Sequence, residues 1–217
     1  MRVSNVVTTK VKGDQLEAAV AAGIEAAGLV GRHGGDVNFY LAGVAGEEVN
    51  STVFSVEYES PEALGVAFDA MAQDAEIQAF TTRLNAADSP SQVTSTSMTM
   101  DLPLGREPKP GQGSLLEVHV GKPNPGRMLD VLAEAAEVCD FVEANGAVNA
   151  RLQQLTYAGM ASGMTAFTWE LENMAAHARL GSAWFSDAGL AVQAKSMSTN
   201  PASIMISSAL YNRIPLA

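Results

Sequence analysis

The chain has 217 residues, of which 47% are hydrophobic and 17% charged, and its formal net charge is −11. This composition predicts a folded protein with a sizeable core, as one domain or two of about 100 residues each, and excludes a disordered chain. The negative charge argues against nucleic acid as a partner and against an anionic membrane surface.

The first half of the chain alternates strand and helix patterns. A β-branched stretch at 3–9 predicts a strand, and Leu16, Val20 and Ile24 recur at helical spacing until Gly31. Ser60-Pro61-Glu62 is typical of a helix start, with a serine cap and proline at the first helical position. That helix carries an apolar stripe formed by Leu64, Phe68, Met71 and Ala75. Further strands are expected at 37–44, 52–59 and 92–100, with a turn at 46–48.

The clearest interruption of the helix and strand patterns is the segment 102–113, LPLGREPKPGQG. Three prolines and three glycines in these twelve residues cannot continue a helix or a central strand. The segment therefore predicts a linker between a first repeat at 1–101 and a second repeat at 114–217.

The second half repeats the order of the first. Its helices are predicted by Met128, Leu132, Ala135, Cys139 and Val142, which share one face, and by a run from Met174 to about Lys195. Strands are expected at 114–120, 148–157, 165–172 and 203–211, with a loop at 159–163. Val37-Asn38 matches Val148-Asn149 at a shift of 111, and six further residues match at a shift of 113. These are Phe54, Glu57, Glu59, Ala70, Asp74 and Ala75, matching Phe167, Glu170, Glu172, Ala183, Asp187 and Ala188.

Each half thus reads β-α-β-β-α-β, which indicates an internal duplication. Such a unit packs its helices on one face of its sheet, yet apolar residues occur on both faces of the strands, as at Phe54 and Val53. A second sheet would cover the other face. The predicted fold class is therefore α+β, with two tandem ferredoxin-like repeats whose antiparallel sheets form a pseudo-dimeric α+β barrel.

The third strand and second helix of each half, VFSVEYESPEALGVAFDAMAQDAEIQAF and AFTWELENMAAHARLGSAWFSDAGLAVQ, resemble the dimeric α+β barrel superfamily. In both halves a bulky residue is followed, three residues later, by Asp-Ala. The bulky residue and the aspartate are Met71 and Asp74 in one half, and Trp184 and Asp187 in the other. The superfamily includes antibiotic-biosynthesis-monooxygenase-like, EthD-like and NIPSNAP-like proteins. The functions that this resemblance implies include those of cofactor-independent oxygenases, isomerases and haem-binding proteins, and the superfamily also includes proteins without known activity.

Three residues of the second half are the candidate catalytic set. Glu117 and His119 share a face of one strand, because strand side chains alternate. If the registers align, Glu170 on the neighbouring strand lies near His119, and a carboxylate beside an imidazole gives a general base near neutral pH. The alternative is a hydrogen-bonded polar patch inside the barrel.

The same residues include possible ligands of a metal ion or a haem. His119, Glu117 and Glu170 could bind zinc or iron in principle, but no HxH or HExxH spacing occurs. Haem needs a proximal histidine, for which His177 or His119 is available, but neither has the expected positive cluster nearby. The expectation is a protein without cofactor or metal.

The resemblance implies a pocket between each sheet and its helices. In the second half, Trp169, Trp184, Tyr157, Arg151 and His177 are the expected ligand-binding residues, where the first half has Val56 and Met71 at the positions of the two tryptophans. The second half is therefore the predicted site. Asn5 is a further candidate, because monooxygenases of this fold use an asparagine on the first strand.

Two functions follow from these patterns. The first is an enzyme, a cofactor-independent oxygenase or isomerase acting on a small apolar or aromatic molecule. The second is a non-catalytic NIPSNAP-like protein that binds a small molecule or acts through oligomeric contacts. The single cysteine cannot form an internal disulfide, and the chain shows neither a signal peptide nor an apolar membrane span. The expected setting is cytoplasmic with no membrane partner, and a homodimer is allowed.

Overall fold

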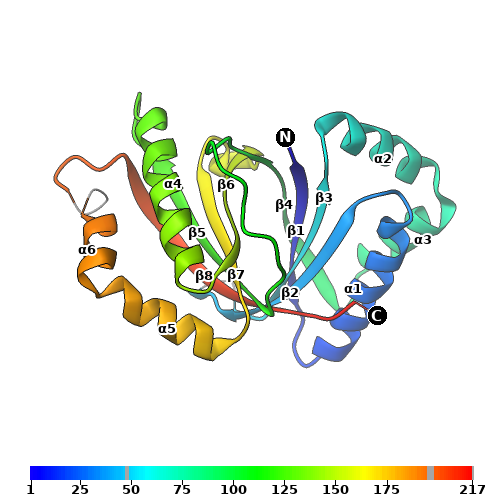
Figure 1. Ribbon diagram of the computed structural model, residues 1–217. Helices are drawn as coiled ribbons and strands as arrows, with labels where there is room; N and C mark the ends of the chain where they lie inside the picture. Colours follow the sequence, from blue (N-terminus) through cyan, green and yellow to red (C-terminus); the bar gives the residue numbers. More distant parts are fainter. Residues whose placement is uncertain (47–48, 195–197, 217) are drawn as a thin grey trace. The chain divides into compact units, whose positions relative to one another are not determined.

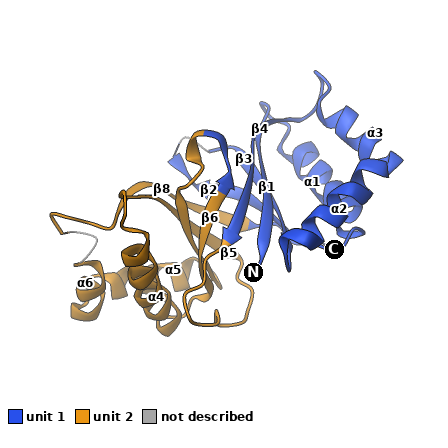
Figure 2. Ribbon diagram, turned by 90° about the horizontal axis from the view of Figure 1, so that it is seen from above, with its two compact units in different colours: residues 1–100, 156–159, 213–217 blue, residues 101–155, 160–212 orange. Residues whose placement is uncertain are grey.

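The computed structural model describes residues 1–46, 49–194 and 198–216. The chain forms two compact units (Figure 2). The first comprises residues 1–100, 156–159 and the C-terminal residues from Arg213, and the second comprises 101–155 and 160–212.

The first unit is a four-stranded antiparallel sheet with its helices on one face (Figure 1). The strand order is β4-β1-β3-β2. Its elements in chain order are β1 (Val3–Val11), α1 (Leu16–Gly31), β2 (Asp36–Val44), β3 (Ser51–Tyr58), α2 (Pro61–Gln73), α3 (Ala75–Leu84) and β4 (Ser91–Asp101).

The sheet-facing side of α1 differs from the predicted stripe. Leu16 and Ile24 are 41% and 40% exposed, whereas Ala19 and Ala27 are buried. Gly23 faces β2 so closely that a Cβ there would lie 2.2 Å from Cζ of Phe39. Because the aromatic ring occupies this space, α1 can approach the sheet only through its small residues.

The second helix of the unit begins as predicted but ends early. Ser60 caps α2 by accepting a hydrogen bond from the backbone N–H of Ala63 at 3.2 Å. The predicted single helix is interrupted at Asp74, whose backbone is extended. Its Oδ1 accepts from the backbone N–H groups of Glu76 and Ile77, so Asp74 caps a separate helix, α3.

The second unit has the same element order and also carries its helices on one face of its sheet (Figure 1). Its strand order is β8-β5-β7-β6, with antiparallel neighbours throughout. Its elements are β5 (Leu115–Pro123), α4 (Met128–Ala144), β6 (Val148–Tyr157), the short turn η2 (Gly159–Ala161), β7 (Thr165–Leu171), α5 (Met174–Trp184), α6 (Asp187–Gln193) and β8 (Ser203–Arg213). Here too the second predicted helix divides, at Ser186, which caps α6. Within the described ranges, no helix is long and apolar enough to cross a membrane.

The predicted linker 102–113 contains no helix or strand and is attached to the second unit. Glu143 forms an ion pair with Arg106 and accepts the backbone N–H of Lys109 at 2.8 Å. At the end of the segment, a Cβ on Gly113 would lie 2.4 Å from the carbonyl oxygen of Leu171, so only glycine fits there. The segment is therefore a strap tied to the second unit by its own hydrogen bonds.

The predicted α+β class with two ferredoxin-like βαββαβ units and antiparallel sheets is confirmed. Two predicted details fall partly on residues outside the described ranges: the turn at 46–48 and the end of the last helix at Lys195.

Candidate functional site

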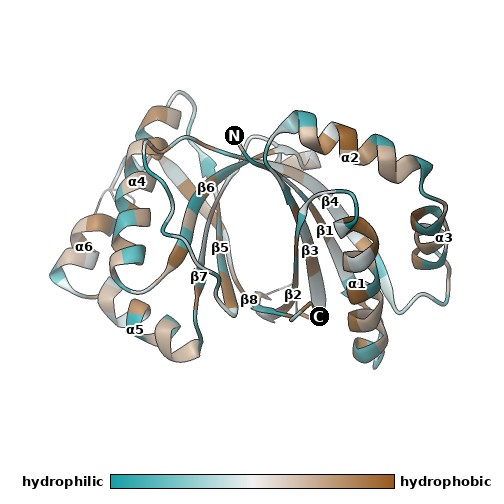
Figure 3. Cartoon of the chain, turned by 45° about the vertical axis from the view of Figure 1, so that its right-hand side comes forward, coloured by the Kyte–Doolittle hydropathy of each residue, from teal (hydrophilic) through white to brown (hydrophobic). Residues whose placement is uncertain are grey.

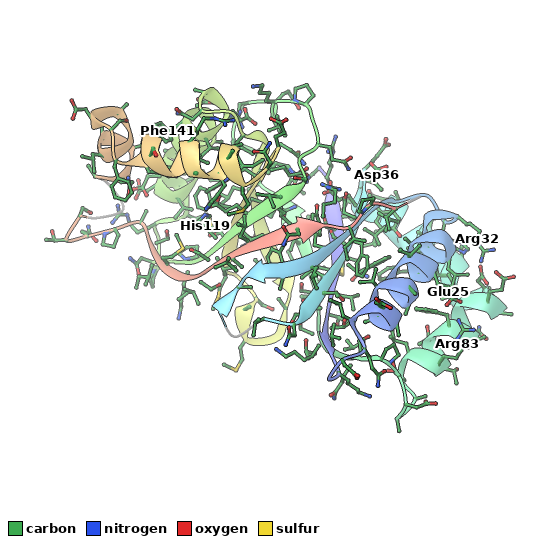
Figure 4. All side chains as sticks on the ribbon, turned by 90° about the horizontal axis from the view of Figure 1, so that it is seen from below. Glu25, Arg32, Asp36, Arg83, His119 and Phe141 are labelled. Atoms are coloured by element: carbon green, nitrogen blue, oxygen red, sulfur yellow. The ribbon has the colours of Figure 1, made fainter. Side chains whose placement is uncertain are left out.

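Glu117 and His119, the predicted pair on β5, lie together on the helix-facing side of the second sheet. His119 Nε2 is 2.8 Å from Glu117 Oε1, and its Nδ1 is 2.8 Å from the hydroxyl of Ser208. Both ring nitrogens of His119 (labelled in Figure 4) are therefore engaged by side chains.

Two further side chains complete this cluster. Trp169 faces Glu117 across the β5–β7 pair, and its indole N–H donates to Glu117 Oε2 at 3.1 Å. The rings of Trp169 and His119 are stacked with centroids 4.7 Å apart. From α5, His177 Nδ1 lies 3.2 Å from the same carboxylate oxygen. Because α5 supplies this contact, the hydrogen-bonded cluster lies between the sheet and the helices, and not at the location that the alternative gave it.

The carboxylate of Glu117 is held in its charged form. Burial alone would raise its pKa. The hydrogen bond to His119, the charges of His119 and His177, and the Trp169 N–H act in the opposite direction and lower the pKa of Glu117 below its ordinary value. The group is thus an acceptor shared by three donors.

Glu170 does not lie beside His119, contrary to the prediction. The β5–β7 register places His119 opposite Phe167 and Leu116 opposite Glu170, which puts Glu170 on the other face of the sheet. Its oxygens accept hydrogen bonds from the backbone N–H of Gly113 at 2.7 Å and from the Asn149 side chain at 3.0 Å. Glu170 therefore helps to attach the strap.

The other predicted ligand-binding residues are dispersed. Tyr157 lies at the end of β6 and is 74% exposed, so it does not line a pocket between the sheet and the helices. Arg151 is buried and its Nη1 lies 3.4 Å from Asp101. Trp184 packs against Phe141 with ring centroids 4.5 Å apart. These residues do not converge on one site.

The space between sheet and helices in the second unit is filled by packed side chains. Trp169 is 3% exposed and belongs to a core cluster with Leu171, Leu180 and Cys139, against which Trp184 packs. The two tryptophans, predicted as the walls of a pocket, are here part of the core.

The first unit instead contains a cavity of about 180 Å³ in the equivalent place. The sheet strands β1, β2 and β3 form its floor, and α1, α2 and α3 form its roof. Its lining is mostly apolar, and Phe39, Phe54, Phe68 and Phe80 contribute aromatic rings.

Corresponding positions in the two units explain the space in the first unit. Residues 112 positions apart correspond in the first strands and helices, because β1 and β5, and α1 and α4, begin 112 residues apart. At the cavity, α1 has small residues where α4 has larger ones: Ala19, Gly23 and Ala26 correspond to Val131, Ala135 and Val138. The small side chains leave room that the larger ones occupy in the second unit.

Two polar side chains in this cavity are suited to bind a ligand. Asn5 faces Val56 across the β1–β3 pair, as Glu117 faces Trp169, so Asn5 corresponds to Glu117. Tyr58 lines the cavity and is 3% exposed, and its hydroxyl has no hydrogen-bond partner among the residues described. Burial raises the pKa of Tyr58, which keeps the phenol protonated and able to donate.

The helix α3 covers the cavity without burying any of its own residues. Both ends of α3 are tied to α1 or to the residues that follow it: Arg32 lies 2.8 Å from Glu76, His33 lies 3.0 Å from the cap residue Asp74, and Arg83 pairs with Glu25 of α1. Figure 4 shows Glu25 on α1, Arg32 just after α1 and Arg83 on α3, and Figure 3 shows hydrophobic and hydrophilic residues mixed along α3. The roof is therefore held by polar contacts at its rim.

Sequence reasoning noted Asn5 but missed Tyr58 and the cavity. The available signal was the run of alanine and glycine in α1, which contrasts with the larger residues of the second repeat. In the part of the chain that the structure covers, no group of three or more His, Cys, Asp or Glu is arranged to hold a metal ion. His119 does not fit the role of a haem ligand either, since both its nitrogens are occupied.

Comparison with known proteins relates the chain to solved structures, although no family model and no curated protein matches it. A monooxygenase candidate from Lactobacillus acidophilus has a TM-score of 0.61 at 7% identity, over 98% of this chain and 93% of that one. An anthrone oxidase-like protein has a TM-score of 0.58 at 10% identity, over 99% and 92%. A chlorite dismutase variant from Candidatus Nitrospira defluvii has a TM-score of 0.56 at 14% identity, over 99% and 92%.

These likenesses span nearly the whole chain, and at such low identity they define its fold. The chain folds as two ferredoxin-like α+β units, and the resemblance found in the sequence is confirmed at the level of the fold.

Proposed function

We propose that this chain is a small-molecule enzyme, a cofactor-independent oxygenase whose substrate binds in the cavity of the first unit. The observation that carries the proposal is the apolar cavity lined by Asn5 and by Tyr58, whose buried hydroxyl has no hydrogen-bond partner among the described residues. An apolar pocket with a few polar groups is the usual form of a small-molecule site. The monooxygenase and anthrone oxidase-like names of the structural neighbours support the same class.

The chemistry suits a substrate that forms an enolate, such as an anthrone. The substrate loses a proton from its activated carbon to water, and the enolate oxygen accepts hydrogen bonds from Asn5 and Tyr58. The enolate then gives electrons to O2 and forms a carbon–oxygen bond. Loss of water from the resulting hydroperoxide leaves a ketone, so one oxygen atom enters the product and the other leaves as water.

The composition of the cavity wall favours an oxygenase over an isomerase. An isomerase needs a group that removes a proton and returns it elsewhere on the substrate. The described residues that line the cavity include no Asp, Glu, His or Lys. The same observation supports the alternative of a binding protein without turnover, which the following experiment separates from the enzyme.

The test is oxygen uptake with anthrone as the probe, in the presence of a chelator, together with the appearance of anthraquinone. Asn5→Ala should lower the rate about hundredfold, as loss of one donor to a developing oxyanion does. His119→Ala should leave the rate close to that of the wild type, because His119 belongs to the second unit. Loss of activity in His119→Ala alone would move the site to the second unit. Anthrone binding without oxygen uptake would support the binding protein.

A further inference from the structure

The residues that line the cavity of the first unit extend along strands β1 and β3. Tyr58 lines it near one end of the β1–β3 pair, and Thr9 and Thr52 line it near the other, where they face each other in the register. Thr52 and Tyr58 are six residues apart on β3, so their backbones are separated by about 20 Å at roughly 3.3 Å per residue. The positions between them are lined by apolar groups such as Phe54 and Val56.

The two ends differ in their hydrogen bonding. The hydroxyls of Thr9 and Thr52 lie 2.7 Å apart and satisfy each other. The hydroxyl of Tyr58 is buried and has no partner in the described ranges. Asn5 is the diagonal neighbour of Tyr58, since Asn5 faces Val56 and Val3 faces Tyr58. A ligand oxygen is therefore accommodated best at the Tyr58 end.

The cavity wall is also uncharged. No Asp, Glu, Lys, Arg or His lies among the described residues that line it. Burial of an ion without a partner of opposite charge is strongly unfavourable, so a charged ligand is disfavoured throughout this space.

We propose that the cavity selects an uncharged, elongated apolar molecule whose hydroxyl or carbonyl oxygen binds Tyr58 and whose apolar tail runs along β3 toward Thr9 and Thr52. Tyr58 is the residue that orients it. This inference rests on the proposed function for the location of the substrate, and it adds the shape, charge and direction of the bound molecule.

The experiment measures binding of para-alkylphenols with methyl, butyl and octyl chains by calorimetry at neutral pH, where these phenols are uncharged. Affinity should rise up to about fourfold for each added methylene that is buried. Para-octylbenzoate, which has the same tail and an ionised head, should bind at least tenfold more weakly than para-octylphenol. Affinity that does not depend on chain length, or equal binding of the benzoate, would overturn the proposal.

Tyr58→Phe tests the orienting hydroxyl. It should weaken the binding of each phenol about two- to tenfold, the usual value of one neutral hydrogen bond, and leave the dependence on chain length unchanged. Tyr157→Phe is the matched control on an exposed tyrosine and should bind like the wild type. The chain-length series on the wild type stands even if Tyr58→Phe is poorly folded.

The outcome is separable from that of the proposed function. Selective binding of long phenols without oxygen uptake from anthrone would overturn the enzyme and leave this inference intact. Oxygen uptake that depends on Asn5, combined with phenol binding that Tyr58→Phe does not weaken, would overturn this inference and leave the enzyme intact.

Discussion

The carboxylate of Glu117 is shared by donors from two strands and one helix. His119 and His177 approach its two oxygens, and the indole N–H of Trp169 donates to one of them. A buried network in which the polar atoms are paired stabilises one arrangement of the surrounding elements. We therefore interpret this cluster as a structural connection between β5, β7 and α5.

The pH dependence of stability should show this role. The pKa of Glu117 is lowered on folding, so its contribution to stability is present above its ordinary value of about 4.5 and is lost as the pH falls below it. Glu117→Gln should reduce the free energy of unfolding by about 1–3 kcal/mol at neutral pH. The difference from the wild type should shrink as the pH approaches 3.5.

Urea unfolding at several pH values between about 3.5 and 7 measures this difference. Glu172→Gln, which changes an exposed carboxylate just after β7, is the control and should follow the wild type. A constant difference between Glu117→Gln and the wild type at all pH values would contradict the assignment.

The Glu117–His119 pair shows which side-chain positions can be predicted from the sequence of a single strand. Alternation along β5 was sufficient to place the two side chains on one face. The face of Glu170 depends on the register between β5 and β7, which the sequence does not determine without the turn geometry. For this reason Glu170 was predicted beside His119, whereas the register places Trp169 on that face and Glu170 on the other.

At the level of elements, α3 is the least securely packed helix over the cavity. None of its residues is buried, and further hollows lie on its α2 side and on the side toward β4. The ion pairs and hydrogen bonds to α1 are exposed contacts, which contribute little individually. The helix is therefore expected to open more readily than α1.

The cap at Asp74 provides a test. Asp74→Ala removes the acceptor for the first N–H groups of α3 and should destabilise the helix by about 1 kcal/mol. Hydrogen exchange should become several-fold faster at 77–84 and remain unchanged in α1. Asp74→Asn, which retains a good capping residue, is the control and should preserve most of the protection. Equal exchange in both variants would exclude the capping role.

The sequence does not predict the helix break at Asp74, although Asp74 belongs to the Asp-Ala pattern that both halves share. The apolar stripe Leu64, Phe68 and Met71 continues to Ala75 at helical spacing, and this favours one long helix. Aspartate is compatible with a helix interior but is a better cap, and the choice depends on contacts with Arg32 and His33, which follow α1. Contacts from a distant segment are not visible in a local pattern.

At the level of the whole molecule, the two units have the same element order but differ in the size of the side chains between sheet and helices. The larger residues of the second unit suggested a functional pocket, but they fill the space in which a ligand would lie. The smaller residues of the first unit leave the cavity. Comparing the two halves of the sequence indicated where their interiors differ. Which half leaves space between sheet and helices depends on how its side chains pack, and the sequence does not determine this.

An exchange of side chains between the units tests this account. Trp169→Val introduces the residue of the first unit and should lower the free energy of unfolding by about 3 kcal/mol, because it leaves a cavity and removes the hydrogen bond to Glu117. The reciprocal change, Val56→Trp, should abolish binding of para-octylphenol by filling the first cavity. Urea unfolding and calorimetry measure the two effects. Unchanged phenol binding by folded Val56→Trp would place the ligand elsewhere.

The strap at 102–113 joins the two units in one polypeptide. This has a consequence for the evolution of the sequence. In an assembly of identical protomers every substitution appears twice, so a side chain that blocks one cavity blocks both. In this chain each position is encoded separately. Trp169 can therefore fill the core of one unit while Val56 lines a cavity in the other, and selection can act on each position separately.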